Sequence, residues 1–101
     1  MANAKYNMAD KIAVENRKKA GAYLKDIRMK TEPRITQKQI ADKLGIEYYT
    51  FISQVEAGAS RLPPQHVADW AKICNASISE VGKTLLKYYD PHMFDAIFMS
   101  K

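Results

Sequence analysis

The stretch Thr36–Gly58, TQKQIADKLGIEYYTFISQVEAG, contains two short amphipathic segments joined by a turn at Gly45. The first segment begins with a capping-box pattern, in which Thr36 can accept from the backbone N–H of Gln39 and the Gln39 side chain can bond back. Apolar residues then recur at helical spacing, and they are Ile40, Ala41 and Leu44. Glycine readily adopts a left-handed conformation and therefore ends helices. The pattern predicts a helix over TQKQIADKL that stops at the glycine.

The second segment predicts a helix with two unlike faces. Successive side chains turn by about 100° along a helix. One face is then apolar, with Tyr48, Phe51, Ile52 and Val55, and the other is small and uncharged, with Thr50, Ser53, Gln54 and Ala57. Hydroxyl and amide groups suit the base edges in a DNA groove. The alternative is an ordinary helix surface that faces solvent.

Before this stretch, the chain predicts an arm, one helix and a loop. Residues 1–9 have no periodicity. The helix runs from about Glu15 to Lys30 and can begin as early as Asp10, which is a good capping residue. Gly21 weakens the prediction of an unbroken helix, because glycine is a poor helix former. Pro33 disfavours helix at the residue before it and predicts a loop at residues 31–35.

After this stretch, the chain predicts two helices and allows a third. Pro63-Pro64 suits the first turn of a helix whose apolar stripe is Val67, Trp70, Ala71 and Cys74. Asn75 is a suitable stop. Ser77 and Glu80 form a second capping box, which opens a helix with the stripe Ile78, Val81, Leu85 and Tyr88. Asp90-Pro91 ends that helix and can begin a short sixth one. No segment alternates as a strand does, so we predict an all-α fold.

These elements divide the chain into three parts. We expect an N-terminal arm at residues 1–14, a five-helix domain at residues 15–90 and an apolar tail at residues 91–101. The apolar residues in and beside the tail include Tyr88, Phe94, Ile97 and Phe98. They either cap the core of the monomer or form a two-fold dimer contact, since an exposed patch of this kind is a liability without a partner.

The positive charge is concentrated in the first part of the chain. Of a net charge of +5, residues 1–38 hold ten Lys and Arg against four Asp and Glu, and residues 39–101 hold six against seven. This excess predicts a segment that faces phosphate groups, with Arg17 and Lys18 as candidate contacts. A solvated basic segment is the alternative.

Little in the sequence points to catalysis, cofactors or secretion. Cys74 is the one cysteine, and it lies on a predicted apolar face as a plain buried thiol. His66 and His92 have no thiol or carboxylate at metal-ligand spacing. We expect no enzyme activity, no metal and no cofactor. The N-terminus has no apolar run that suits a signal peptide or membrane span, so we expect a cytoplasmic protein without membrane contact.

The motifs from Leu24 to Leu86, a little under two thirds of the chain, resemble one known family. They are Ile27-Arg28, Ile35-Thr36-Gln37, Ile40-Ala41, Leu44-Gly45-Ile46, Ile52-Ser53, Val55-Glu56, Gly58 and the proline-led helix. The chain is similar in these residues to the lambda-repressor/Cro-like (XRE) helix-turn-helix family. It has one more residue in the turn after Gly45 than the family usually has, and about two more in the loop at residues 31–35.

The resemblance implies a five-helix domain in which the second helix of the pair is the recognition helix and lies in the major groove. It implies that Gln37 contacts the DNA backbone and that Arg28 and Glu56 form a structural ion pair. It places the recognition-helix contacts at Tyr48, Tyr49, Thr50, Ser53 and Gln54. The helical angle of Tyr48 lies nearer the core than the groove, so we expect a half-buried ring with its hydroxyl on the DNA side.

We therefore expect a sequence-specific DNA-binding transcriptional regulator, a repressor that binds an inverted-repeat operator in double-stranded DNA as a homodimer. The expected base contacts are Tyr49, Thr50, Ser53 and Gln54. The expected backbone contacts are Gln37, Lys38, Tyr48, Arg61, Arg17 and Lys18. The alternative is an antitoxin or accessory protein of the same fold, whose tail binds a protein partner such as a toxin.

Overall fold

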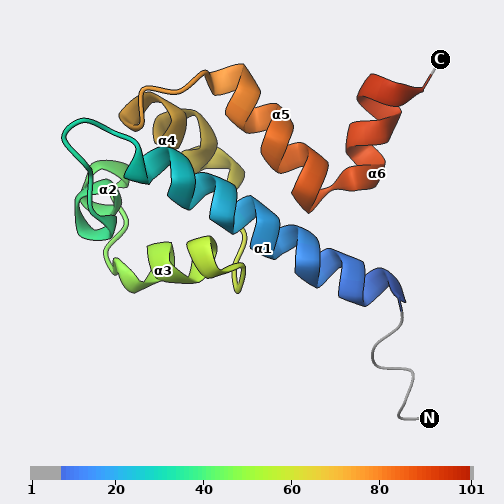
Figure 1. The fold of residues 1–101 in the computed structure, drawn as a ribbon, viewed down its shortest axis with the longest axis horizontal. Helices are drawn as coiled ribbons and strands as arrows, with labels where there is room; N and C mark the ends of the chain where they lie inside the picture. Colours follow the sequence, from blue (N-terminus) through green and yellow to red (C-terminus); the bar gives the residue numbers. More distant parts are fainter. Residues whose placement is uncertain (1–7, 101) are drawn as a thin grey trace, which may run out of the picture.

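The computed structural model describes residues 8–100, and these residues form helices and turns with no strand among them (Figure 1). The helices are α1 (Met8–Met29), α2 (Gln37–Leu44), α3 (Thr50–Ala57), α4 (Val67–Ile73), α5 (Ile78–Tyr89) and α6 (Pro91–Phe94). A 3-10 turn at Pro64–His66 precedes α4, and a π-helical turn at Asp95–Met99 follows α6. The predicted all-α class is confirmed. Within the described residues, none of the helices has the length and apolar character that a membrane span needs.

The long helix α1 runs through the middle of the molecule, as Figure 1 shows. Helix α3 packs on one side of it and α5 packs on the other. Helices α2 and α4 contact each other near the end of α1, and each also contacts its neighbour in the chain, α3 and α5 respectively. Every other helix of the bundle is therefore positioned, directly or through one neighbour, by α1.

The first helix begins earlier than predicted. It starts at Met8, not near Glu15, so residues 8–14 are helical and do not belong to an arm. This part of the chain contains no glycine or proline, and Asp10 in the first turn interacts favourably with the helix dipole. The rest of the predicted arm, residues 1–7, lies outside the described residues.

The local signals for the other helix ends are found in the structure. Thr36 and Gln39 form the complete capping box, and Gly45 ends α2 with a φ of 74°. At the start of α5, Ser77 accepts from the backbone N–H of Glu80. The return bond from the Ser77 N–H to the Glu80 side chain is not found among the described residues, so the predicted second capping box is only half formed. Asn75 adopts a left-handed φ of 58° after α4. One expected core residue is misplaced, because Ile78 lies in the first turn of α5 beyond the edge of the core and is 44% exposed.

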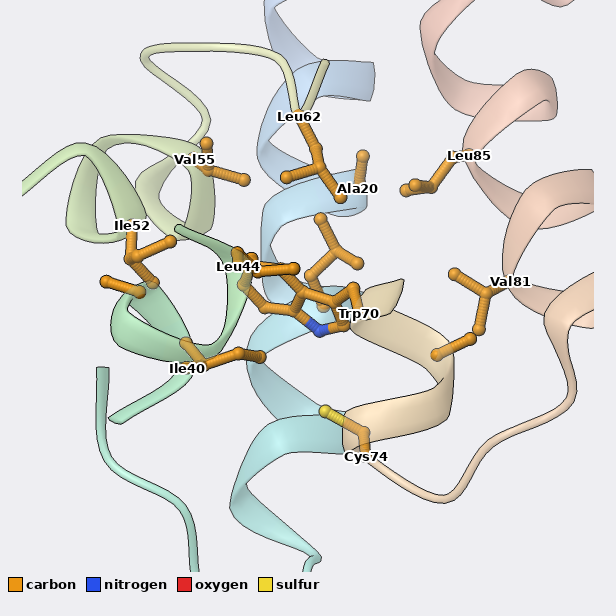
Figure 2. Close-up of a cluster of buried hydrophobic side chains, with 13 residues drawn as sticks. Ala20, Ile40, Leu44, Ile52, Val55, Leu62, Trp70, Cys74, Val81 and Leu85 are labelled. Carbon is orange, nitrogen blue, oxygen red and sulfur yellow. The ribbon is translucent and has the colours of Figure 1, made fainter. Parts of the chain in front are cut away.

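Trp70 lies at the centre of the core (Figure 2). In Figure 2 its indole lies among buried side chains from α1, α2 and α5 and from the loop before α4, and they include Ala20, Ile40, Leu44, Leu62, Val81 and Leu85. Cys74 is also buried, and burial raises the pKa of its thiol to about 11. The thiol therefore stays protonated and contributes as a small apolar group.

Two glycines, Gly21 and Gly58, allow close contact between the backbones of α1 and α3. Helix α1 is continuous through Gly21, and a Cβ at that position would overlap the carbonyl oxygens of Val55 and Glu56. Gly58 at the end of α3 has a φ of 85° and lies against the backbone of Lys18. Gly21 therefore does not interrupt α1, and its missing side chain permits the close approach of α3.

Replacing Gly21 by alanine should destabilise the fold. The added methyl group has no space beside the α3 carbonyls, and overpacking of this kind typically costs roughly 1–3 kcal/mol. Gly82 in α5 is a matched control, because a Cβ there meets nothing within 4 Å. Gly82→Ala should instead stabilise the protein by up to about 1 kcal/mol. Urea unfolding of both variants measures the difference, and equal effects of the two substitutions would contradict this explanation of the helix contact.

Candidate functional site

A buried ion pair joins α1 to the end of α3. The Arg28 Nε donates to Glu56 Oε2 at 2.7 Å, and Nη2 donates to Glu56 Oε1 at 2.9 Å. Both residues are buried within the apolar core. A third donor, Arg28 Nη1, bonds the backbone carbonyl of Ile35 at 2.8 Å, just before α2 begins. The ion pair expected from the resemblance is therefore present, and the same guanidinium also holds the entry to α2.

Two of the expected DNA contacts extend this pair toward the surface. The side-chain amide of Gln37 donates to Glu56 Oε1 at 2.9 Å. The Ser53 hydroxyl donates to Gln37 Oε1 at 2.7 Å. Ser53 precedes Glu56 by three residues and so lies one turn away on the same side of α3. We call the connected side chains of Arg28, Glu56, Gln37 and Ser53 the polar relay. It links the start of α2 to the middle of α3.

The link between Gln37 and Ser53 was not predicted. Each residue was selected separately, and no local pattern shows that two side chains 16 positions apart meet. The sequence signal that could have indicated this link is the spacing of Ser53 from Glu56, because residues three apart lie on the same side of a helix. Which α2 residue it would reach depends on how α2 and α3 pack.

The outer face of α3 remains uncharged and open. Thr50 and Gln54 are exposed, and Ser53 is partly exposed. Tyr48 and Tyr49 stand immediately before Thr50, with 69% and 49% of their surfaces exposed. The prediction that the Tyr48 ring is half-buried is therefore wrong. The prediction assumed that Tyr48 belongs to α3, but α3 begins at Thr50 and Tyr48 lies in the preceding turn.

The basic residues expected at phosphates differ in their surroundings. Lys38 is exposed on α2, next to Gln37. Lys18 is exposed on α1 beside Gly58, at the end of α3. The Arg17 Nε donates to the Gly58 carbonyl oxygen at 3.4 Å, so this side chain interacts with the C-terminus of α3. Neither lysine forms an ion pair with a carboxylate among the described residues, so Lys18 and Lys38 are the more available phosphate ligands.

Arg61 has partners within the protein. Its Nη2 bonds Asp90 Oδ2 at 2.6 Å, and its guanidinium lies 4.7 Å from the centre of the Tyr89 ring. The Tyr89 hydroxyl in turn accepts from the backbone N–H of Leu62. The sequence reasoning missed these contacts, because Asp90 was interpreted only as a helix stop and cap. A phosphate contact by Arg61 would have to compete with the Asp90 carboxylate.

The tail adds no residue to the core among those the structure describes. Helix α6 turns back from the end of α5 and projects from the bundle (Figure 1). Ile97 and Phe98 are 56% and 46% exposed, while Phe94 is partly buried and its ring lies 4.9 Å from that of Phe98. Tyr88 is partly buried and packs against the core. Of the two alternatives for this segment, core capping applies to Tyr88 alone, and the other three expected interface residues lie outside the core.

Breaking the buried ion pair should be far more damaging than breaking the exposed one. Glu56→Ala leaves the Arg28 guanidinium buried without its carboxylate, which typically costs roughly 3–5 kcal/mol. The matched control is Asp90→Ala, which breaks the Arg61 pair where both side chains are over two fifths exposed. That loss should stay below about 1 kcal/mol. Urea unfolding tests both, and a Glu56→Ala effect as small as the control's would show that the buried pair does not hold the fold.

Comparison with known proteins returned no match among family models, curated proteins or solved structures. The resemblance to the helix-turn-helix family therefore rests on the sequence motifs given above.

Proposed function

We propose that this protein is a sequence-specific DNA-binding transcriptional regulator that reads the major groove with α3. The observation that supports this most is the polar relay. It holds α3 against α2 and α1 from the inner side, while the uncharged polar face of α3 stays available to a ligand. A recognition helix needs both features, because base contacts require a defined orientation and an unobstructed face.

In this proposal, the residues divide into readers and positioning contacts. Gln54 is exposed on α3, and a glutamine amide can bond both N6 and N7 of adenine. Thr50 and Tyr49, at the start of the helix, offer a methyl group and a ring edge to thymine methyl groups or backbone. Gln37, Lys38, Lys18 and the Tyr48 hydroxyl bind phosphates, which orients the domain without reading sequence.

The proposed regulator is a repressor that acts as a homodimer. The exposed side chains of Ile97 and Phe98, with the partly buried Phe94 beside them, supply the dimer surface in this proposal, and burying them between two copies removes them from water. A two-fold dimer places its two recognition helices roughly 34 Å apart, in successive major grooves. The operator is then an inverted repeat, and occupancy of promoter DNA excludes the transcription machinery.

The same tail favours a second candidate function. An antitoxin or accessory protein of this fold would use Ile97 and Phe98 to bind a different protein, such as a toxin. The two proposals differ in the DNA that they predict. A homodimeric repressor needs two half-sites at a constant spacing, whereas a chain that requires a protein partner selects no symmetric site alone.

Selection of bound duplexes from a random DNA pool tests the proposed function. We expect an inverted repeat whose binding weakens steeply with added salt, because bound Lys side chains release counterions from phosphates. Gln54→Ala should lower affinity for the selected site by roughly 5- to 100-fold, the range for loss of a bidentate base contact. Affinity for unrelated DNA should change little.

A matched surface variant controls for nonspecific effects. Ser79 is an exposed residue of α5, which lies on the opposite side of α1 from α3 (Figure 1), and Ser79→Ala should leave both affinities unchanged. Equal losses of specific and unrelated binding in Gln54→Ala would show that this residue does not read bases. Failure to enrich any sequence, or binding that is insensitive to salt, would contradict DNA as the ligand.

A further inference from the structure

The direction of each hydrogen bond in the polar relay follows from its chemistry. A guanidinium can only donate hydrogen bonds, and Arg28 donates to both carboxylate oxygens of Glu56. The Glu56 Oε1 atom accepts from Arg28 and also faces the Gln37 amide at 2.9 Å. A carboxylate oxygen bonded in this way presents only lone pairs to Gln37.

This arrangement determines which way the Gln37 amide is turned. Its NH₂ group must face Glu56, because the opposite orientation would place the amide oxygen against a carboxylate oxygen. Its Oε1 then faces Ser53 at 2.7 Å. An amide oxygen cannot donate, so the Ser53 hydroxyl must donate its single hydrogen to Gln37. The buried ion pair of Arg28 and Glu56 thus sets the orientation of the Ser53 hydroxyl through the side chain of Gln37.

The Ser53 oxygen is left with lone pairs only. A serine hydroxyl has one hydrogen and two acceptor sites. Turning the hydrogen toward DNA would leave the Gln37 oxygen without a donor in a partly buried site, which is unfavourable. The second hydrogen of the Gln37 NH₂ group has no acceptor among the described residues and remains available to a phosphate oxygen.

We infer that Ser53 acts as an obligate hydrogen-bond acceptor and selects a base that presents an exocyclic amine in the major groove. The inference rests on the proposed function, in which this face of α3 meets base edges. Adenine offers its N6 amine and cytosine its N4 amine at that edge, whereas guanine and thymine present oxygens. The base that Ser53 contacts is therefore adenine or cytosine. A serine whose hydroxyl could rotate would be able to bond any of the four bases, because it could either donate or accept.

The test uses the selected operator with wild-type protein and Ser53→Ala. We expect one position in each half-site at which wild type requires adenine or cytosine and Ser53→Ala accepts any base. At that position, the base is replaced by its analogue without the exocyclic amine, which is 2′-deoxynebularine for adenine or the 2-pyrimidinone nucleoside for cytosine. Loss of one hydrogen bond should weaken wild-type binding by roughly 3- to 10-fold.

The analogue should not weaken binding of Ser53→Ala, which separates a lost contact from any effect on the duplex. For adenine, 7-deazaadenine keeps the amine and removes N7, and it should leave wild-type affinity unchanged. A wild-type requirement for guanine or thymine beneath Ser53, or indifference to the missing amine, would overturn the inference while the proposed function stands. A selection that enriches no sequence would overturn both.

Discussion

The buried pair of Arg28 and Glu56 is the interaction on which the rest of the structure depends. Charges in an apolar core are tolerated only while their hydrogen bonds are complete, and Glu56 accepts from both Arg28 and Gln37. Satisfying one carboxylate therefore brings together α1, the start of α2 and the end of α3. Arg28 also bonds the Ile35 carbonyl, which ties the loop before α2 to the same point. The pair specifies the relative positions of three helices.

Close packing of backbones supports this constraint. Gly21 lets α1 approach the last turn of α3, and Gly58 turns the chain away from α3 beside Lys18. The inner side of α3 is consequently packed into the bundle, where Ile52, Val55 and Glu56 are buried. On its outer side, Thr50 and Gln54 are not covered by any of residues 8–100 and remain exposed. The proposed role of α3 as the recognition helix follows from this difference between its buried side and its exposed side.

The sequence predicted those parts of the fold that local chemistry specifies. Helix α2 was placed correctly because Thr36, Gln39 and Gly45 cap it with their own side chains and backbone. The start of α1 was misplaced because helix-forming residues extend toward Met8 without a stop signal. Tyr48 was misplaced for a related reason, since its direction depends on where α3 begins. The contact of Ser53 with Gln37, and that of Arg61 with Asp90, depend on tertiary packing that no spacing in the chain specifies.

We propose that the outer face of α3, held by the polar relay, is the surface that meets DNA. Backbone amide chemical shifts, recorded by NMR as a duplex is added to the full chain, test it most directly because they report contact residue by residue. We expect the largest changes in chemical shift at Gln37, Lys38 and residues 48–54, with small changes in α5. Shifts confined to α6 and the following turn, with α3 unaffected, would contradict it and assign the binding surface to the tail.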